Sequence, residues 1–195
     1  MTAETSETPT RRSDVTRAAI LDAARRRFAR DGFHKATIRA IAADAGIDPS
    51  MVMRYYGNKE GLFTAALDID LGLPDLGLVD PGSFGEVLVR RFLAIWETPP
   101  SNEVLMTLLR TVVTDESMVE RVLQLFATQA MPMVLRAGDP ADAPHRAGLV
   151  VSQILGLALC RYVLRIPSVV ALTHDELVAD IAPTLQRYLT MRPGR

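Results

Sequence analysis

Two short helical patterns separated by a tight turn, within residues 37–63, constrain the fold more than any other feature of the chain. Thr37 can cap the first helix through its hydroxyl, and apolar residues then recur at helical spacing at Ile38, Ile41, Ala42 and Ala45. Gly46 ends this helix, because a residue here commonly needs a positive φ, which glycine adopts without steric cost. Asp48 and Pro49 suit the start of a second helix over residues 50–55. This order predicts a helix-turn-helix.

The second helix should lie in the DNA major groove, with its outward side chains at the base edges. Arg54 is the candidate guanine reader, because a guanidinium fork matches guanine O6 and N7, whereas methionine offers only apolar contacts. Lys59, at the start of the next helix, is a candidate phosphate contact. The complete candidate set for DNA binding is Thr37, Arg39, Ser50, Met51, Met53, Arg54, Tyr55 and Lys59. Two short helices around a glycine turn also occur in all-α proteins as plain packing, and the turn alone leaves that alternative open.

Charge is distributed unevenly along the chain, although the net charge is only −1. Residues 11–63 carry 11 Lys and Arg against 6 Asp and Glu, whereas residues 64–195 carry 11 against 15. Such asymmetry indicates nucleic-acid contact at the basic end, because neutralising phosphates supplies most non-specific affinity. Within the basic part, the first helix should bury Ile20, Leu21, Ala24 and Phe28 and should expose Arg25, Arg26, Arg27 and Arg30.

The order and spacing of short motifs in residues 15–66 are specific: Asp31-Gly32-Phe33 after the first helix, Thr37 before the second, Gly46-Ile47 in the turn, then Tyr55, Tyr56, Lys59, Glu60 and Leu62. In these motifs the segment resembles the amino-terminal DNA-binding domain of the TetR (tetracycline repressor) family. The resemblance implies an all-α homodimer that represses transcription until a small molecule binds its larger carboxy-terminal domain. One departure is Met53, where the family usually has a tyrosine that contacts the phosphate backbone.

The remaining sequence predicts an all-α fold, because it has helical spacing and no alternating strand pattern. We expect a flexible tail over residues 1–13, a helix-turn-helix domain over 14–71 and a helical ligand-binding and dimerisation domain over 72–195. Ser13 or Asp14 should cap the first helix, and a linking helix should run from Lys59 past Leu67. The glycines and prolines of residues 71–83 predict the linker between the domains.

In the carboxy-terminal domain, spacing and caps predict helices over residues 83–97, 101–113, 115–126, 145–164 and 173–191. Ser83 should cap the first of these, and Pro132 should kink or end the continuation of the third. Residues 137–144 are expected to form a surface loop, and Pro183 should bend the last helix. Thr173 followed by Glu176 has the spacing of a capping box.

The sequence contains no HExxH motif, no glycine-rich phosphate loop and no cysteine pair. We therefore expect no enzyme activity, no cofactor and no metal site. Cys160 is the single cysteine, which fits a reducing compartment, and the amino terminus lacks the apolar core of a signal peptide. The most apolar run, residues 148–160, is too short to span a bilayer. These features predict a cytoplasmic protein with no membrane partner.

A cluster of aromatic and methionine side chains lies in the helices that the resemblance places around the family's ligand cavity. Such side chains adapt to varied apolar ligands, so we expect a mostly apolar effector, with Arg110 or Gln129 as a polar anchor. The candidate pocket residues are Phe92, Trp96, Met106, Leu109, Arg110, Phe126, Gln129, Met131 and Met133. The alternative for each apolar residue is a plain core position.

Small residues recur every four positions in the helix over 145–164, at Gly148, Ser152, Gly156 and Cys160. This spacing places them on a nearly straight ridge along one helix face, which lets another helix approach closely. Bulky residues flank the ridge, at Leu149, Leu155, Leu159 and Val163. In the resembled family the last two long helices of each subunit form a four-helix bundle, so we expect the ridge at a homodimer interface. The alternative is that it packs only within its own subunit.

Together these features predict a DNA-binding transcriptional regulator, a repressor released from a palindromic operator by a small apolar effector. Two other classes stay open at this stage. One is a DNA-binding regulator without a physiological ligand, and the other is a helical carrier or enzyme that keeps the three-helix unit only as packing.

Overall fold

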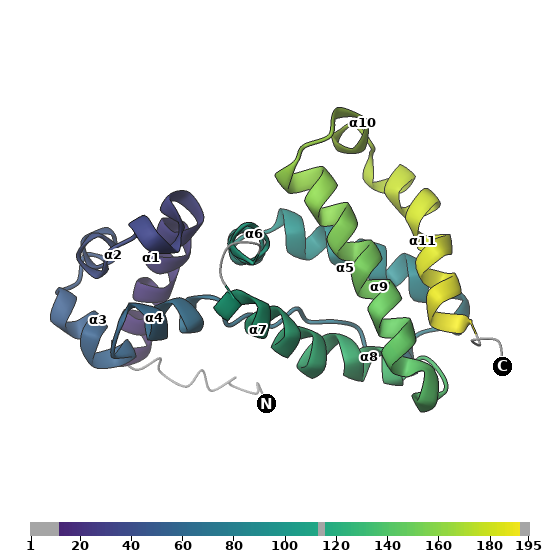
Figure 1. Ribbon diagram of the computed structural model, residues 1–195, viewed down its shortest axis with the longest axis horizontal. Coiled ribbons are helices and arrows are strands. Elements are labelled where there is room, and N and C mark those ends of the chain that lie inside the picture. The colour runs from purple at the N-terminus through teal and green to yellow at the C-terminus, as the bar shows by residue number, and fades with distance from the viewer. Residues whose placement is uncertain (1–11, 113–115, 192–195) are drawn as a thin grey trace, which may run out of the picture. The chain divides into compact units, whose positions relative to one another are not determined.

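The computed structural model describes residues 12–112 and 116–191, and within these ranges every regular element is helical (Figure 1). The predicted all-α fold class is therefore confirmed. The chain divides into two compact units, an amino-terminal unit, Met1–Asp68, and a carboxy-terminal unit, Ile69–Arg195. Most of the predicted flexible tail lies outside the described residues.

Among the described residues, the amino-terminal unit contains α1 (Arg12–Lys35), α2 (Ile38–Ala45), α3 (Pro49–Tyr56) and α4 (Lys59–Ala66). Helix α1 is interrupted at Gly32, whose φ of 74° kinks the chain where the first helix was expected to end. The predicted start of α1 lies too far along the chain, because Ser13 and Asp14 belong to the first helical turn and do not precede it. The Ser13 hydroxyl donates to the Asp14 carboxylate and caps no backbone group.

The core of the amino-terminal unit forms around three phenylalanine rings. The Phe63 ring lies 4.6 Å from that of Phe28 and 4.7 Å from that of Phe33, measured between centroids. Ile20, Ala24 and Phe28 are buried as predicted, while Leu21 is only half-buried. Helix α4 ends at Ala66, not beyond Leu67 as predicted, and the Arg25 guanidinium donates to the terminal Ala66 carbonyl at 2.9 Å.

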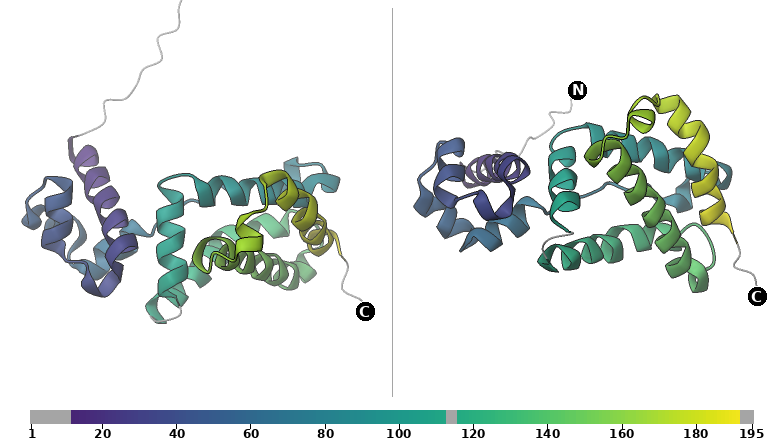
Figure 2. Two further views of the ribbon diagram at one scale, coloured as in Figure 1. Left: turned by 90° about the horizontal axis from the view of Figure 1, so that it is seen from above. Right: turned by 45° about the horizontal axis from the view of Figure 1, so that its top comes forward.

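The carboxy-terminal unit begins with an extended segment, residues 69–75, and the short 3₁₀ turns η1 (Leu76–Leu78) and η2 (Pro81–Ser83). Its described helices are α5 (Phe84–Glu97), α6 (Ser101–Thr111), α7 (Glu116–Leu125), α8 (Met131–Leu135), α9 (Ala143–Ala158), α10 (Pro167–Val170) and α11 (His174–Thr190), with a 3₁₀ turn η4 (Pro140–Asp142). Helix α11 runs along α5, and α9 packs against α11 (Figures 1 and 2).

A glycine and a glutamine set the contact between α5 and α11. A Cβ atom at Gly85 would overlap the Ala182 carbonyl, so the two backbones approach closely only because glycine stands here. The Gly85 N–H donates to Gln186 Oε1 at 2.9 Å. This bond takes the place of the predicted cap, because Ser83 makes no side-chain cap bond. The Thr173–Glu176 capping box of α11 is present as predicted.

Two π-helical turns, η3 (Phe126–Ala130) and η5 (Leu159–Val163), widen long helices of this unit. In η3 the Met131 N–H donates to the Phe126 carbonyl, five residues back. Pro132 is the second residue of α8, which follows this wide turn and continues to Leu135, so the proline does not end the helix.

Several predicted boundaries in this unit are wrong. The surface loop over 137–144 is shorter, because α9 begins at Ala143 and that residue is fully buried. Helix α10 was not predicted, since its four residues are too few to show a period. The predicted end of α6 at Val113 and the predicted start of the next helix at Asp115 lie outside the described residues. Helix α6 ends at Thr111.

Candidate functional site

Local side-chain bonds build the helix-turn-helix as the sequence predicts. The Thr37 hydroxyl accepts from the Ala40 N–H at 3.2 Å, which caps α2. Gly46 has φ 66° in the left-handed region, where the Ile47 N–H reaches the Ala42 carbonyl at 2.9 Å. The Asp48 carboxylate accepts from the Ser50 N–H at 2.8 Å, and hydrogen bonding from the Ser50 side chain and then from its backbone lowers the pKa of Asp48. These caps fix the turn between α2 and α3.

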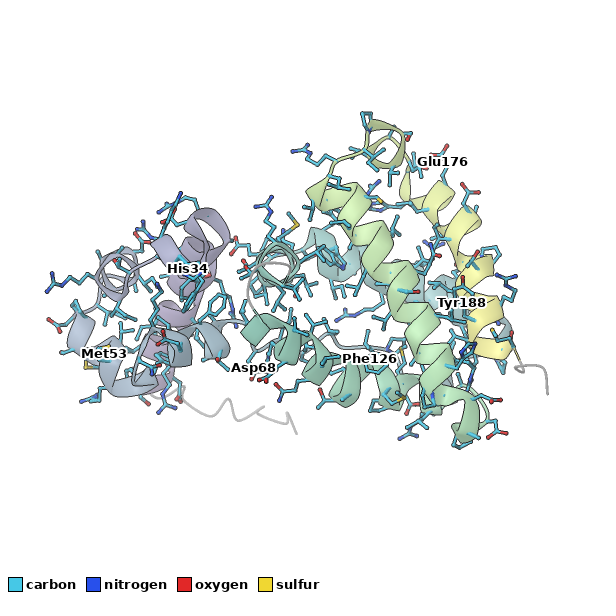
Figure 3. The ribbon with its side chains drawn as sticks, in the orientation of Figure 1. His34, Met53, Asp68, Phe126, Glu176 and Tyr188 are labelled. Atoms are coloured by element: carbon cyan, nitrogen blue, oxygen red, sulfur yellow. The ribbon has the colours of Figure 1, made fainter. Side chains whose placement is uncertain are left out.

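Helix α3 exposes the side chains predicted to face DNA. Val52 is fully buried, whereas Ser50 and Arg54 are exposed, Met53 is 45% exposed (labelled in Figure 3) and Met51 is half-buried. On α2 and at its cap, Arg39 and Thr37 are also exposed. The predicted base-contacting side chains are thus accessible on the helix, and their contact with DNA stays a prediction.

Of the α1 arginines predicted to be exposed, Arg26 and Arg30 are exposed, whereas Arg25 and Arg27 are half-buried and bonded within the unit. Arg27 donates to both carboxylate oxygens of Asp44, at 2.7 and 2.6 Å, and to Asp31 at 3.2 Å. Arg30 also donates to Asp31, at 2.8 and 3.1 Å. The Arg30 bond and then the Arg27 bond lower the pKa of Asp31 to about 2. These side chains join α1 to α2, because Asp44 belongs to α2.

Lys59, a predicted phosphate contact, also makes two contacts within its own unit. Its ammonium lies 4.4 Å from the centroid of the Phe33 ring and donates to the His34 carbonyl at 3.3 Å. An ammonium has three donors, so the lysine keeps capacity for a phosphate. Tyr55 and Tyr56 are half-buried at the end of α3, and the Tyr56 hydroxyl lies 3.4 Å from the Arg17 carbonyl, to which it donates.

The carboxy-terminal unit contains a cavity of about 250 Å³ whose described lining is apolar throughout. Its wall is formed by α5, α6, α7, α8, α9, the π turn η3 and the extended segment after residue 69. Of the predicted pocket residues, five lie in this wall: Phe92, Trp96, Leu109, Phe126 and Met133; Figure 3 labels Phe126. Sequence reasoning missed Leu71, Leu73, Leu88, Ile95, Leu105, Leu108, Val112, Val122, Leu125, Ala130, Val150, Val151, Ile154 and Leu155. The helical spacing of these apolar residues predicted that they are buried, but not that they surround a cavity.

Four predicted pocket residues do not line this cavity: Met106, Arg110, Gln129 and Met131. Neither predicted polar anchor therefore faces it. Arg110 is exposed. The Gln129 amide is already bonded on both sides, because its nitrogen donates to the Ile69 carbonyl at 2.8 Å and its oxygen accepts from the Leu71 N–H at 2.7 Å. Gln129 therefore holds the extended segment that contributes Leu71 to the wall.

A polar cluster closes one end of the carboxy-terminal unit, where α5 ends. Glu97 accepts from the Tyr162 hydroxyl at 2.9 Å and bonds His174 Nε2 at 2.7 Å. Burial acts to raise the pKa of Glu97, but the bonds from Tyr162 and His174 outweigh it and lower that pKa. The Tyr162 ring stacks on Trp96 with centroids 5.2 Å apart. No sequence pattern indicated this cluster, because its members come from three separate elements.

In the described part of the chain, the predicted small-residue ridge is largely uncovered. Gly148, Ser152 and Gly156 are exposed, and a Cβ atom added at either glycine would meet nothing within 4 Å. Cys160 is half-buried in the π turn η5, where a spacing of four residues no longer returns to the same face, so it departs from the ridge. Leu155 and Leu159, which flank the ridge, are 36% and 38% exposed.

By length and composition, the continuous helical stretch Pro140–Val163 would suffice to cross a membrane. It is longer than the apolar run of residues 148–160 considered above. Core helices of soluble proteins pass the same test, and this stretch contains Arg146, which is fully buried and donates to the Leu189 and Asp139 carbonyls.

Comparison with known proteins adds to this geometry. A family model described as "Tetracyclin repressor-like, C-terminal domain" matches residues 83–189, and one described as "Bacterial regulatory proteins, tetR family" matches residues 20–66. An HTH-type transcriptional repressor of Streptomyces coelicolor is 42% identical over 55 residues, which make up 28% of this chain and 29% of that protein. The match thus spans less than a third of that relative.

Solved structures share the fold over nearly the whole chain. A TetR-family regulator from Streptomyces coelicolor A3 is 26% identical with a TM-score of 0.64, over 95% of this chain and all of that one. SmeT in complex with triclosan is 17% identical with a TM-score of 0.66, over 92% of this chain and 93% of that one. Because the carboxy-terminal family model alone covers more than half of the chain, and the second covers the helix-turn-helix, this protein belongs to the TetR family of DNA-binding transcriptional regulators.

Proposed function

We propose that this regulator is a repressor that leaves a palindromic operator when a small, mostly apolar molecule fills the cavity of its carboxy-terminal unit. The observation that carries the proposal is the apolar cavity of about 250 Å³ in the same chain as a capped, exposed reading helix. The related Streptomyces protein is named a repressor, and SmeT is seen with triclosan, which support this assignment. In this proposal the protein is cytoplasmic and has no enzyme activity.

The apolar lining supports a neutral, apolar class of effector. A charged group in this cavity would be desolvated with no described polar side chain to pair with it, which costs several kcal/mol or shifts its protonation. An uncharged apolar molecule gains by leaving water, at about 25 cal/mol per Å² of buried surface. We therefore expect neutral effectors, with hydrogen bonds contributing little to their affinity.

The proposal is tested by binding of the full-length protein to the DNA upstream of its own coding region. Fluorescence anisotropy of the labelled duplex is followed while lipophilic and highly charged fractions of a cell extract are added separately. Release of the DNA by the lipophilic fraction is the expected result. Release only by small charged metabolites would contradict the apolar effector, and no release by either fraction would favour a regulator without a ligand.

Arg54 is proposed to read a guanine from α3. Replacing it with alanine should weaken specific binding by about 1 to 3 kcal/mol and relax the preference at one base pair, because the fork to O6 and N7 is lost. Lys59→Ala should weaken all sequences evenly and lower the salt slope by about one unit. Unchanged affinity and base preference of the Arg54→Ala protein, at fixed salt, would refute the groove assignment.

We further propose that two copies of the chain pair through α9 and α11. Support comes from the uncovered ridge at Gly148, Ser152 and Gly156, which lets a second helix approach closely. Two-fold symmetry would then set the two reading helices one DNA turn apart, about 34 to 36 Å. A bilayer is the less favourable environment for this helix, because Arg146 is held inside the fold by carbonyl groups.

Gly156→Leu tests the dimer, with Ser152→Ala as the matched control on the same ridge. The bulky side chain should force the paired helices apart and yield a folded monomer or a weakened dimer with poor operator binding, whereas the small one should leave the dimer intact. Sedimentation velocity measures both variants. A Gly156→Leu dimer as tight as the wild type would show that the ridge faces elsewhere.

A further inference from the structure

The structure sorts the cationic side chains of the amino-terminal unit into two groups. Those bonded within the unit are Arg25, Arg26, Arg27, Arg30 and Lys59, which reach a carboxylate or a backbone carbonyl. Four others are exposed and, among the described residues, have no carboxylate partner: Arg17, Lys35, Arg39 and Arg54. A cation without a carboxylate partner keeps a charge that a DNA phosphate can neutralise.

Arg17 and Arg54 come from different helices and meet at one aromatic ring. The guanidinium carbon of Arg17, on α1, lies 5.1 Å from the centroid of the Tyr55 ring, and that of Arg54, on α3, lies 5.3 Å from it. Both distances are in the range of a cation–π contact. The neighbouring Tyr56 donates its hydroxyl to the Arg17 carbonyl at 3.4 Å, which fixes this turn of α1 against the end of α3.

Two like charges held at one ring repel each other unless an anion lies near them. The structure provides the ring that positions the two guanidinium groups, but none of the described carboxylates pairs with either of them. A DNA phosphate supplies the missing negative charge, and a guanidinium presents the planar donor pair that binds it.

We propose that Arg17 binds a DNA phosphate next to the base read by Arg54, and that Tyr55 positions both guanidinium groups. The proposal rests on α3 being the DNA-reading helix of the proposed function. It assigns to α1 a direct contact with DNA, made by a residue that the sequence patterns did not single out. Tyr55 then acts through its ring face, so its hydroxyl is dispensable for this purpose.

The test is the salt dependence of binding to a random-sequence duplex, which requires no knowledge of the operator. Arg17→Gln should reduce the slope of log K against log salt by about one unit, so that its affinity falls several-fold at low salt and less at high salt. Arg17→Lys should restore the slope, because the positive charge is kept. The matched control is Arg26→Gln, which removes an exposed arginine of the same helix that is paired with Asp22.

Two further variants test the platform. Tyr55→Phe should behave like the wild type, whereas Tyr55→Leu should lower the slope as Arg17→Gln does, and adding Arg17→Gln to Tyr55→Leu should then have a reduced effect. Thermal unfolding shows whether each variant is folded, and the Arg17 variants carry the test if Tyr55→Leu is not.

The outcomes separate this proposal from the proposed function. A wild-type slope in Arg17→Gln, or an equal loss in Arg26→Gln, would overturn the phosphate site, since the effect would then be absent or due to overall charge. A wild-type protein that does not bind duplex DNA would instead refute the proposed function, and with it the reading role of α3.

Discussion

The two units of this chain use different means to hold their helices. In the amino-terminal unit, side chains cap each short helix after α1, at Thr37, Asp48 and Asn58, and ion pairs join α1 to α2. In the carboxy-terminal unit, several helices lack side-chain caps, two turns are π-helical, and apolar walls surround a cavity. The first arrangement fixes a surface for recognition, and the second leaves a hollow that a ligand can fill.

The largest difference should appear when a phenylalanine is removed from each unit. Phe28 is 1% exposed and packs on Phe63, so Phe28→Ala should lower the free energy of unfolding of its unit by about 3 to 5 kcal/mol. Phe126 lines an existing cavity and is half-buried, so Phe126→Ala should cost less. Denaturant titrations followed by circular dichroism measure both. Equal losses would show that the cavity wall is packed as tightly as the small core.

Arginines of the two units also differ in their partners. In α1, Arg27 pairs with carboxylates, whereas the buried Arg146 of the carboxy-terminal unit bonds backbone carbonyls. Arg146 donates to the Leu189 carbonyl at 2.8 Å and to the Asp139 carbonyl at 2.6 Å, while its Nε has no partner among the described residues. Arg146→Ala should destabilise the unit by about 2 to 3 kcal/mol, because two carbonyls lose their donors. Arg146→Met should cost less, since it keeps the packing and removes a desolvated charge. A methionine variant as unstable as the alanine variant would contradict this reasoning.

Caps should have smaller effects, and the carboxy-terminal unit offers an internal control. Thr173→Ala breaks the capping box of α11 and should cost about 1 kcal/mol. Ser83→Ala alters the equivalent position of α5, where no cap bond is made, and should be nearly neutral. Thermal unfolding of the two variants compares them directly. A neutral Thr173→Ala would mean that packing alone sets the start of α11.

The smallest predicted effect is a pH dependence confined to the amino-terminal unit. The pKa of Asp31 is lowered to about 2 by Arg30 and Arg27, so its carboxylate stabilises the folded state above the ordinary pKa of an aspartate. This contribution should be lost as the pH falls from about 4 towards 2. Asp31→Asn should remove that part of the acid unfolding curve. The same acid dependence in Asp31→Asn would assign the effect to another carboxylate.

The same contrast explains which features the sequence could predict. Thr37 and Asp48 accept hydrogen bonds from backbone N–H groups at most three residues away, and Gly46 adopts a left-handed backbone conformation. Because these effects are local, the spacing of the residues was enough to predict the reading helix. Gln129 instead bonds the backbone of residues 69–71, and Arg27 bonds Asp44, so both act on residues far from them in the sequence. These contacts depend on tertiary packing, which no local pattern encodes. The prediction that Cys160 lies on the small-residue ridge assumed regular α-helical geometry. The π turn at residues 159–163 departs from that geometry, so Cys160 lies off the ridge.

The central claim is that filling the cavity releases the DNA, and the single tryptophan makes it measurable in one titration. Trp96 lies in the cavity wall, so its emission reports occupancy while the anisotropy of a labelled upstream duplex reports DNA binding. A neutral, apolar compound from the lipophilic fraction of the extract is added to the full-length protein on that duplex. We predict that the emission and the anisotropy change over the same concentration range. A saturating change in Trp96 emission with the DNA complex intact would contradict the account.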